Sequence, residues 1–284
     1  MLTCIETKNL TFHYLEGTKM QKTAINNVSV KFNSYDIIAI IGHTGSGKSS
    51  FIQHLNGLLK PSLGKVFVEG QDIWQNKSAT KNARTKVGVV FQHPEYQLFE
   101  DTIYKDIAFG PKNMGISGEE IDRRVRDAAK FVDLNESLLN KSPFDVSGGE
   151  KRKAVIAGVI AMDPNVLVLD ELTAGLDPAS RDLIFSRIIK YHKKRKNTII
   201  FTSHNMEEVA NFSDKVLVFN KGEVAMFGST LEVFEAHEEL CRMGLSVPEV
   251  TDIFLALKRM DHKNLPNCVL TIKQAVKILC QQNP

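Results

Sequence analysis

The chain has 284 residues, of which 43% are hydrophobic and 24% are charged, and this balance is that of a globular rather than a disordered protein. A formal net charge of +3 is small for this length. It argues against a nucleic-acid-binding protein, which would concentrate positive charge on one face. The four cysteines, at positions 4, 241, 268 and 280, form no CxxC pair, and we expect them to be reduced.

The first residues, MLTCIE, lack the basic start and apolar stretch of a signal peptide. No apolar run approaches the roughly 18 residues that a membrane-spanning helix requires. We therefore expect any association with a membrane to depend on a partner protein.

Short apolar runs alternate with helical patterns along much of the chain. The runs cover residues 37–41, 87–91, 166–169, 198–202 and 216–219, and clear helical patterns cover 49–59 and 181–192. Continuous Val, Ile and Leu are typical of strands that are buried on both faces of a parallel sheet. The alternation predicts an α/β fold.

Two regions depart from this alternation. Residues from about 92 to 164 read as mostly helical, most clearly at 119–132 and 150–162, which predicts an inserted helical subdomain. After about residue 229 the strand pattern stops. Two apolar helical faces follow, separated by a loop at 261–267: Val250, Ile253, Phe254 and Leu257, and then Ile272, Ala275, Val276 and Leu279. We therefore divide the chain into a main domain, 1–228, and a helical C-terminal extension, 229–284.

Residues 42–49 fit the pattern GxxxxGK[ST] between a predicted strand and a predicted helix. Glycines let backbone N–H groups curl around phosphate oxygens, and the helix N-terminus points its positive end at the same anion. Lys48 is expected to reach the β- and γ-phosphates, and Ser49 to bind Mg²⁺. The pattern predicts a nucleoside triphosphate site formed by Gly42, His43, Thr44, Gly45, Ser46, Gly47, Lys48, Ser49 and Ser50.

Asp170 and Glu171 directly follow the buried run 166–169. Phosphoryl transfer needs a carboxylate near the metal and a group that orients the attacking water, and we expect Asp170 and Glu171 to fill these two roles. Adjacent carboxylates repel each other unless a cation or a hydrogen-bonding network lies between them. His204 follows another strand of the same predicted sheet, so it is expected beside the γ-phosphate.

The segment Ser147-Gly148-Gly149-Glu150, just ahead of a predicted helix, resembles the signature of ATP-binding cassette (ABC) ATPases. The order of motifs is also similar: the phosphate loop, Gln92 at a strand end, the signature, Asp170-Glu171, a D-loop at 174–177 and His204. The resemblance implies a P-loop ABC nucleotide-binding domain that uses ATP and Mg²⁺. It also implies catalytic roles for Glu171, His204 and Gln92, with Ser49, Gln92 and Asp170 around the metal.

In ABC ATPases two chains enclose two ATP molecules between the phosphate loop of one chain and the signature of the other. The resemblance implies that Ser147, Gly148, Gly149 and Glu150 face a nucleotide held by a partner, with Ser147 and Gly149 as donors to its γ-phosphate. It also implies that Tyr14 stacks on adenine, although Phe12 is an alternative for that role.

A closer resemblance is to the ATPases of energy-coupling factor (ECF) transporters, and to the second of their two paired ATPases. It is carried by GHTGSGKSSFIQHLNGLLKP, VGVVFQHPEYQLFEDTIYKDIAFGPKNMG and AVIAGVIAMDPNVLVLDE, and it extends over essentially the whole chain. It implies vitamin import at the cytoplasmic face of the cell membrane, as a peripheral protein. The implied partners are a second ATPase chain, a transmembrane coupling subunit and an exchangeable substrate-binding membrane subunit, with no nucleic acid.

In that family a groove beside Gln92 receives helices of the coupling subunit, which here implicates Gln92, Pro94, Glu95, Gln97 and Phe99. Alternatively, one or two of the apolar residues Tyr96, Leu98 and Phe99 only cap the local core. Three other functions stay open: a cobalt or nickel importer ATPase, a soluble ABC protein that acts on ribosomes or DNA, and a non-catalytic nucleotide binder. The C-terminal extension is expected to contact the second ATPase, or else to pack on its own chain.

Three positions depart from the family pattern. Glu150 replaces the usual glutamine and adds negative charge near a nucleotide. Leu172 replaces the proline that commonly follows the catalytic glutamate, which removes a backbone restriction. Ser50 replaces threonine, a change expected to be nearly silent.

Overall fold

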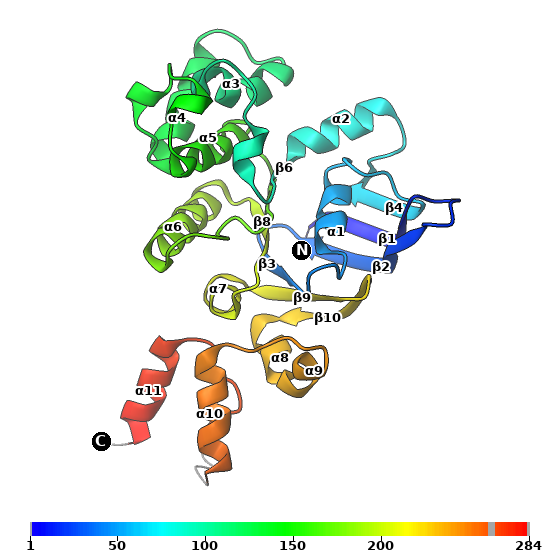
Figure 1. The fold of residues 1–284 in the computed structure, drawn as a ribbon, viewed down its shortest axis with the longest axis vertical. Helices are drawn as coiled ribbons and strands as arrows, with labels where there is room; N and C mark the ends of the chain where they lie inside the picture. Colours follow the sequence, from blue (N-terminus) through cyan, green and yellow to red (C-terminus); the bar gives the residue numbers. More distant parts are fainter. Residues whose placement is uncertain (1, 261–264, 283–284) are drawn as a thin grey trace.

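The computed structural model describes residues 2–260 and 265–282 and contains two sheets with helices around them (Figure 1). The larger sheet has the strand order β10-β9-β3-β8-β7-β6, and its neighbouring strands from β9 to β6 are parallel. These strands are β3 (Ile37–Ile41), β6 (Val87–Val90), β7 (Val166–Leu169), β8 (Thr198–Thr202), β9 (Lys215–Asn220) and β10 (Glu223–Ser229). The predicted α/β fold class is confirmed.

The central strands are buried on both faces, as their continuous apolar sequences predict. Every residue of β3, β7 and β8 is buried. In β3, Ile38 and Ile40 belong to the core between the two sheets, whereas Ala39 and Ile41 belong to the core under the helices. The strand therefore joins two hydrophobic cores, which fixes the position of its carboxyl end.

The smaller sheet is antiparallel and was not predicted. Its order is β2-β1-β4-β5, with strands β1 (Thr3–Tyr14), β2 (Lys22–Asn33), β4 (Leu63–Val68) and β5 (Gln71–Asp72). Asn9 and Asn27 have positive φ angles of 49° and 52°, and the β1–β2 register shifts between Thr7 and Leu10. Such irregularities interrupt the alternation by which a half-buried strand is recognised in a sequence.

A lobe of helices follows β6 and precedes β7, in the region where the sequence predicts a helical insertion (Figure 1). Helix α4 has the predicted bounds, and α5 begins two residues earlier than predicted. The elements of the lobe are the 3₁₀ turn η1 (Pro94–Gln97), α3 (Ile103–Asn113), α4 (Glu119–Val132), η2 (Glu136–Leu138), η3 (Pro143–Asp145) and α5 (Gly148–Ala161).

Two predicted helices have different ends in the structure. Helix α1 (Lys48–Leu55) ends four residues before the predicted position, because Gly57 has a φ of 71° and its N–H binds the carbonyl oxygen of His54 at 3.2 Å. Helix α6 (Pro178–Arg195) begins earlier than predicted, since Asp177 caps it by accepting a hydrogen bond from the N–H of Ser180 at 3.1 Å. Helices α2 (Lys77–Lys86) and α7 (Met206–Phe212) complete the main body.

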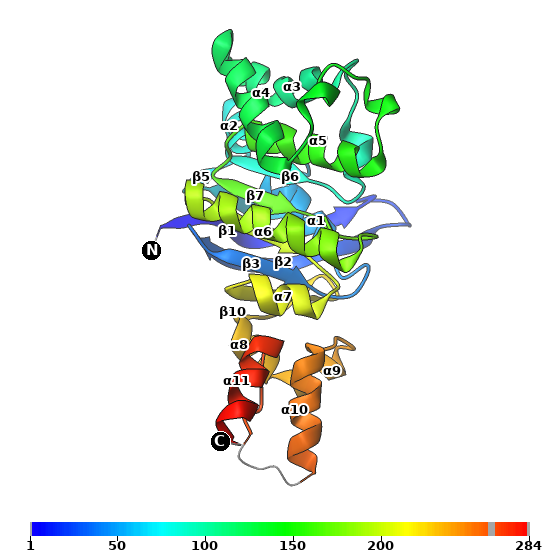
Figure 2. The same cartoon turned by 90° about the vertical axis from the view of Figure 1, so that its left-hand side faces the viewer.

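The last helices form two pairs. Helices α8 (Thr230–Glu235) and α9 (His237–Arg242) contribute Val233, Phe234 and Leu240 to the core of the main body. Helices α10 (Glu249–Arg259) and α11 (Ile272–Gln282) lie side by side and extend away from the sheets (Figure 2). They share a separate small core that includes Phe254, and we call them the hairpin. Of the loop predicted at 261–267, residues 261–264 lie outside the described residues.

Within the described ranges, 2–260 and 265–282, no helix is long and apolar enough to cross a bilayer.

The burial of α8 predicts that the main body needs part of the C-terminal extension for stability. Phe234 is fully buried, whereas Leu231 in the same helix is 45% exposed. Phe234→Ala should lower the free energy of unfolding by about 3–5 kcal/mol, because it leaves a cavity, and Leu231→Ala by no more than about 0.5 kcal/mol. Urea unfolding of the full chain measures both. Equal effects of the two substitutions would contradict the packing described for α8.

Candidate nucleotide site

The loop between β3 and α1 is shaped by close backbone contacts. Gly42 and Gly47 have φ angles of 148° and 111°. A Cβ atom on Gly42 would lie 2.3 Å from the carbonyl oxygen of Phe219, and one on Gly47 would lie 2.5 Å from that of Ala24. Both positions therefore require glycine, and the loop is held between β9 and β2 in one conformation.

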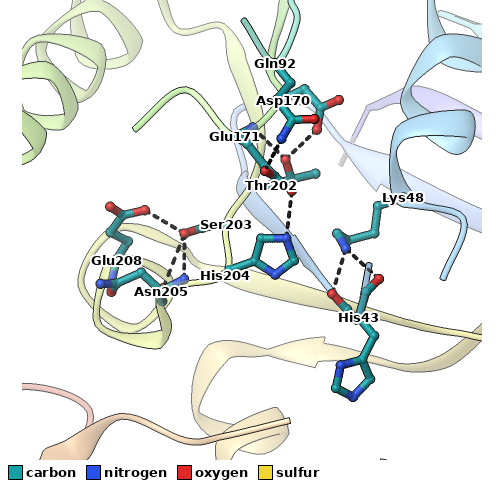
Figure 3. Close-up of polar contacts among 11 residues, drawn as sticks. His43, Lys48, Gln92, Asp170, Glu171, Thr202, Ser203, His204, Asn205 and Glu208 are labelled. Carbon is teal, nitrogen blue, oxygen red and sulfur yellow. Dashed lines mark hydrogen bonds and ion pairs between the residues drawn. The ribbon is translucent and has the colours of Figure 1, made fainter. Parts of the chain in front are cut away.

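Lys48 places a cation inside this loop. Its side chain is buried, and Nζ donates to the carbonyl oxygens of Gly42 at 2.6 Å and His43 at 3.0 Å (Figure 3). Burial lowers the pKa of Lys48, and the charges of Glu171 and Asp170 oppose that shift. Among the described residues this desolvated ammonium group donates only to carbonyl oxygens, which makes it well suited to an anionic ligand.

Other groups of the loop also fit phosphate. Ser46 Oγ is buried and has no hydrogen-bond partner within the described part of the chain. Ser50 Oγ lies 3.0 Å from the hydroxyl of Tyr14. The remaining predicted loop residues, Thr44, Gly45 and Ser49, are exposed at the rim.

Asp170 follows β7 and is buried under the loop. Its Oδ1 accepts a hydrogen bond from Thr202 Oγ1 at 2.7 Å, and Thr202 Oγ1 in turn accepts from the N–H of Glu171 at 2.8 Å (Figure 3). Burial raises the pKa of Asp170, the hydrogen bond from Thr202 opposes that shift, and the charge of Glu171 adds to it. The hydroxyl of Ser49 also lowers the pKa of Asp170, so the two predicted metal ligands are neighbours.

Glu171 is held by two side chains from different loops. Its Oε2 accepts from Gln92 Nε2 at 2.6 Å, and its Oε1 lies 2.7 Å from His204 Nε2, which donates because an ionised carboxylate only accepts (Figure 3). Glu171 also has a φ of 48°, and because Leu172 follows it, its backbone lacks the restriction that a proline would impose. The three residues predicted to be catalytic therefore meet at one point.

Thr202 and Glu208 are parts of the site that the sequence analysis missed. Glu208 is buried and its Oε2 accepts from Thr173 Oγ1 at 3.0 Å and from Ser203 Oγ at 2.6 Å. It thus ties the segment after Glu171 to the segment before His204. Asn205 followed three residues later by Glu208 is a helix-start pattern that identifies α7, but not the contacts of this carboxylate.

The position of Tyr14 favours it over Phe12 as the aromatic residue at the nucleotide. Phe12 packs against the core between the sheets, with its ring 4.8 Å from that of His54. Tyr14 is 40% exposed and meets Ser50 at the end of the phosphate loop. Stacking of Tyr14 on adenine stays a prediction.

The signature segment lies outside this cluster, at the N-terminus of α5 in the helical lobe (Figure 1). Ser147 and Glu150 form a capping box: Ser147 N–H and Oγ both donate to Glu150 Oε2 at 2.8 Å, and Glu150 N–H donates to Ser147 Oγ at 3.3 Å. These hydrogen bonds lower the pKa of Glu150. The carboxylate of Glu150, which is predicted to face a partner's nucleotide, is therefore bound to Ser147.

The convergent residues suit phosphoryl transfer with a magnesium ion. Among the described residues, no group of three or more His, Cys, Asp or Glu side chains is arranged to hold a metal ion. A magnesium site in nucleotide enzymes needs only one or two protein ligands, because phosphate oxygens and waters supply the rest. The site offers such ligands in Ser49 and Asp170, beside a cation and a positioned carboxylate.

Comparison with known proteins agrees with this geometry. Residues 25–174 match the family model described as ABC transporter. The chain is 49% identical over 278 residues, 98% of its length and 97% of the relative's, to the "Energy-coupling factor transporter ATP-binding protein EcfA2" of Clostridium perfringens. It is 47% identical over 271 residues, 95% of its length and 94% of the relative's, to the protein of the same name from Caldanaerobacter subterraneus.

Two solved structures are similar over most of the chain. One is cbiO1 from Clostridium perfringens, described as part of the ABC transporter complex cbiONQ, with a TM-score of 0.74, 33% identity and coverage of 92% of this chain and 98% of that one. The other is a dimeric ATP-binding cassette in a post-hydrolysis state with ADP and Pi. It has a TM-score of 0.73 and 25% identity, and the match covers 80% of this chain and 98% of that one. The chain therefore belongs to the ATP-binding cassette family of ATP hydrolases, and within that family to the ATP-binding proteins of energy-coupling factor transporters.

Proposed function

We propose that this chain is the ATP-binding and ATP-hydrolysing subunit that energises uptake of vitamins or related micronutrients by an ECF-type importer. The observation that carries the proposal is Glu171, bound by Gln92 and His204 next to a phosphate loop with a buried lysine. A regulatory nucleotide binder has no need for a carboxylate oriented from two sides, and this arrangement favours catalysis.

The triphosphate would be held by backbone N–H groups of the loop 42–47 and by Lys48, which must turn from the carbonyl oxygens of Gly42 and His43 toward phosphate. Ser49 and Asp170 would hold Mg²⁺, together with Gln92, whose Oε1 has no hydrogen-bond donor among the described residues. When bound, Mg²⁺ neutralises charge on the β- and γ-phosphates. The negative charges of ligand and carboxylates explain why the site keeps a lysine so deeply buried.

Glu171 would accept a proton from, or orient, the water that attacks the γ-phosphate. Gln92 and His204 fix the direction of its carboxylate, and Thr202 fixes its backbone. Preorganisation of this kind contributes to the rate because the geometry costs nothing further at the moment of reaction.

Glu171→Gln should leave ATP binding intact and reduce steady-state turnover by about 10²- to 10⁴-fold, since the amide retains the shape of the side chain but is not a base. Lys48→Ala should instead weaken ATP binding itself, because it removes a charge-assisted contact to phosphate. Binding of a fluorescent ATP analogue and phosphate release, measured with the membrane partners present, separate the two effects. Wild-type turnover in the Glu171→Gln variant would remove Glu171 from this role.

Pairing with a second ATPase is supported by surfaces that this chain's own packing leaves open. A Cβ atom on Gly148, Gly149 or Gly175 would meet nothing within 4 Å. Small residues there are not needed for internal packing, but they would let a partner's nucleotide approach the N-terminus of α5. Arg152 also donates to the carbonyl oxygen of Ala174 at 3.4 Å, which joins the signature helix to the D-loop.

A transmembrane coupling subunit is supported by exposed aromatic side chains beside Gln92. Tyr96 and Phe99 are 84% and 64% exposed. The ring of Phe99 packs edge to face on that of the half-exposed Phe109, with 4.8 Å between the ring centroids. Pro94 is buried, and Gln97 accepts a hydrogen bond from the N–H of Phe91, so these two residues support the local backbone. Phe109 was absent from the sequence-based set.

Through these contacts the chain would lie at the cytoplasmic face of the cell membrane as a peripheral protein. An exchangeable membrane subunit would select the cargo. No residue of the ATPase is expected to discriminate a vitamin from cobalt or nickel, and neither nucleic acid nor ribosomes are proposed as partners.

Transport assays can test coupling and cargo together. In vesicles with the second ATPase and the membrane subunits, wild type should take up a labelled vitamin, and Phe99→Ala should keep ATP hydrolysis but lose most uptake. Tyr35→Ala, an exposed aromatic before β3 at the opposite end of the sheet, should behave as wild type. Uptake of cobalt or nickel without vitamin uptake would favour the metal importer. Full uptake with Phe99→Ala would contradict the coupling groove.

We further propose that residues 1–228 form the ATPase domain and that 229–284 form an extension whose hairpin contacts the second ATPase. Apolar side chains of the hairpin remain exposed, including Ile253, Ile272 and Val276 at 56%, 76% and 54%. Burial of such residues at an interface stabilises a complex by about 1.5–3 kcal/mol each.

Ile272→Gln with Val276→Gln should therefore weaken pairing with the second ATPase by at least about tenfold, while leaving the fold intact. Lys273→Gln with Lys277→Gln, on the adjoining side of the same helix, is the matched control. Sedimentation of the paired chains measures the affinity. If both double variants pair as tightly as wild type, the hairpin packs elsewhere.

A further inference from the structure

The segment Met243–Glu249 joins α9 to the hairpin and touches the nucleotide site at two separate points. The segment is packed against the main body, because Leu245 and Val247 are buried in its core. The hairpin beyond it has a core of its own, formed by Phe254, Leu265, Val269 and Ala275. A displacement of this segment would therefore move the hairpin as a unit.

The first contact is made by the phosphate loop. His43 Nε2 lies 2.6 Å from the carbonyl oxygen of Met243, and it must be the donor because a carbonyl oxygen only accepts. The next residue, Gly244, has a φ of 73°, and a Cβ atom there would lie 2.9 Å from His43 Nε2 and 3.3 Å from Cε1. The segment thus fits against the imidazole ring without space for a side chain.

The second contact is made by the helix that follows His204. Glu207 Oε1 accepts a hydrogen bond from the N–H of Glu249, the first residue of α10, at 3.0 Å. Glu207 and Glu249 also line a cavity of about 500 Å³. Its other lining residues include Glu171 and His204 and, from the segment and α10, Ser246, Val247 and Asp252. The extension therefore borders the catalytic residues directly.

A chain of contacts links the phosphate-binding lysine to this segment. Lys48 Nζ donates to the carbonyl oxygen of His43, and the side chain of His43 donates to Met243. When Lys48 turns toward a phosphate it gives up the carbonyl oxygen of His43, which still accepts from the N–H of Ser46 at 3.1 Å. The imidazole ring of His43 is held separately, by the carbonyl oxygen of Met243.

We infer that His43 is a positioning residue through which the segment Met243–Glu249 stabilises the phosphate loop, so that nucleotide binding and the docked position of the hairpin support each other. The inference rests on the proposed nucleotide site. Such coupling is reciprocal: if the segment strengthens nucleotide binding, bound nucleotide stabilises the segment by the same factor. One hydrogen bond of about 0.5–1.5 kcal/mol corresponds to a roughly two- to tenfold change in affinity.

Two pairs of variants of the full-length chain test this coupling. Gly244→Ala should weaken binding of a non-hydrolysable ATP analogue about two- to tenfold, because its Cβ atom displaces His43. Gly115→Ala is the control: it has a φ of 84°, and its Cβ atom would meet nothing within 4 Å, so it carries a similar backbone strain without the clash. His43→Ala should have an effect like that of Gly244→Ala. His237→Ala in α9 should not, because among the described residues its ring hydrogen-bonds to the carbonyl oxygen of Glu235 and not to the phosphate loop.

Hydrogen exchange provides the reciprocal measurement. The N–H groups of Gly244, Leu245 and Glu249 are bound to Cys241, Leu240 and Glu207, and their exchange reports on the docking of the segment. Saturating analogue should slow their exchange in wild type but not in His43→Ala. No response in wild type, or equal or tighter binding by Gly244→Ala than by Gly115→Ala, would overturn the inference. Failure of wild type to bind the analogue would instead overturn the proposed nucleotide site.

Discussion

The parallel pairing of β7, β8 and β3 is the constraint on which the site depends. In register, Leu169 lies opposite Phe201, and Ile40 lies opposite Thr202, so these neighbouring strands end at one edge of the sheet. The residues that follow each strand are then brought within hydrogen-bonding distance by the fold alone. Because the strands are buried on both faces, their ends cannot shift without disturbing two cores, and the positions of Lys48, Asp170 and Glu171 are fixed before any ligand arrives.

The charges at this edge explain what the site is built to accept. Burial disfavours the ammonium form of Lys48 and the ionised form of Asp170, so each group lacks the solvation that stabilises it in water. A ligand that carries both a polyanion and a divalent cation supplies a counter-charge to each of them. Glu171 differs, because Gln92 and His204 already satisfy its two oxygens. At this edge of the sheet, Lys48 and Asp170 are therefore suited to bind the ligand, whereas Glu171 is positioned to take part in the reaction.

The parts that sequence could predict are those set by local spacing at strand ends. The glycines and Lys48 of the phosphate loop, Asp170 with Glu171, and His204 all follow buried apolar runs, and parallel topology brings such positions together. Thr202 and Glu208 could not be predicted, because their roles depend on tertiary hydrogen bonds of side chains that belong to no catalytic motif. The antiparallel sheet could not be predicted because its strands are irregular at Asn9 and Asn27. The contact between His43 and Met243 could not be predicted because the two residues are 200 positions apart in the sequence.

The hydrogen bonds of the signature segment bear on the proposed pairing with a second ATPase. The hydroxyl of Ser147 has a single proton, and it donates that proton to Glu150. To donate to a partner's phosphate it must give up this bond, and hydrogen bonds to charged acceptors are worth about 1.5–3 kcal/mol, against about 0.5–1.5 kcal/mol for neutral ones. With glutamine at position 150 the exchange would cost less, and no negative charge would face the nucleotide. In the proposed pair, closure on this signature would therefore cost more than closure on a glutamine-containing one, and the two nucleotide sites of unlike chains would differ.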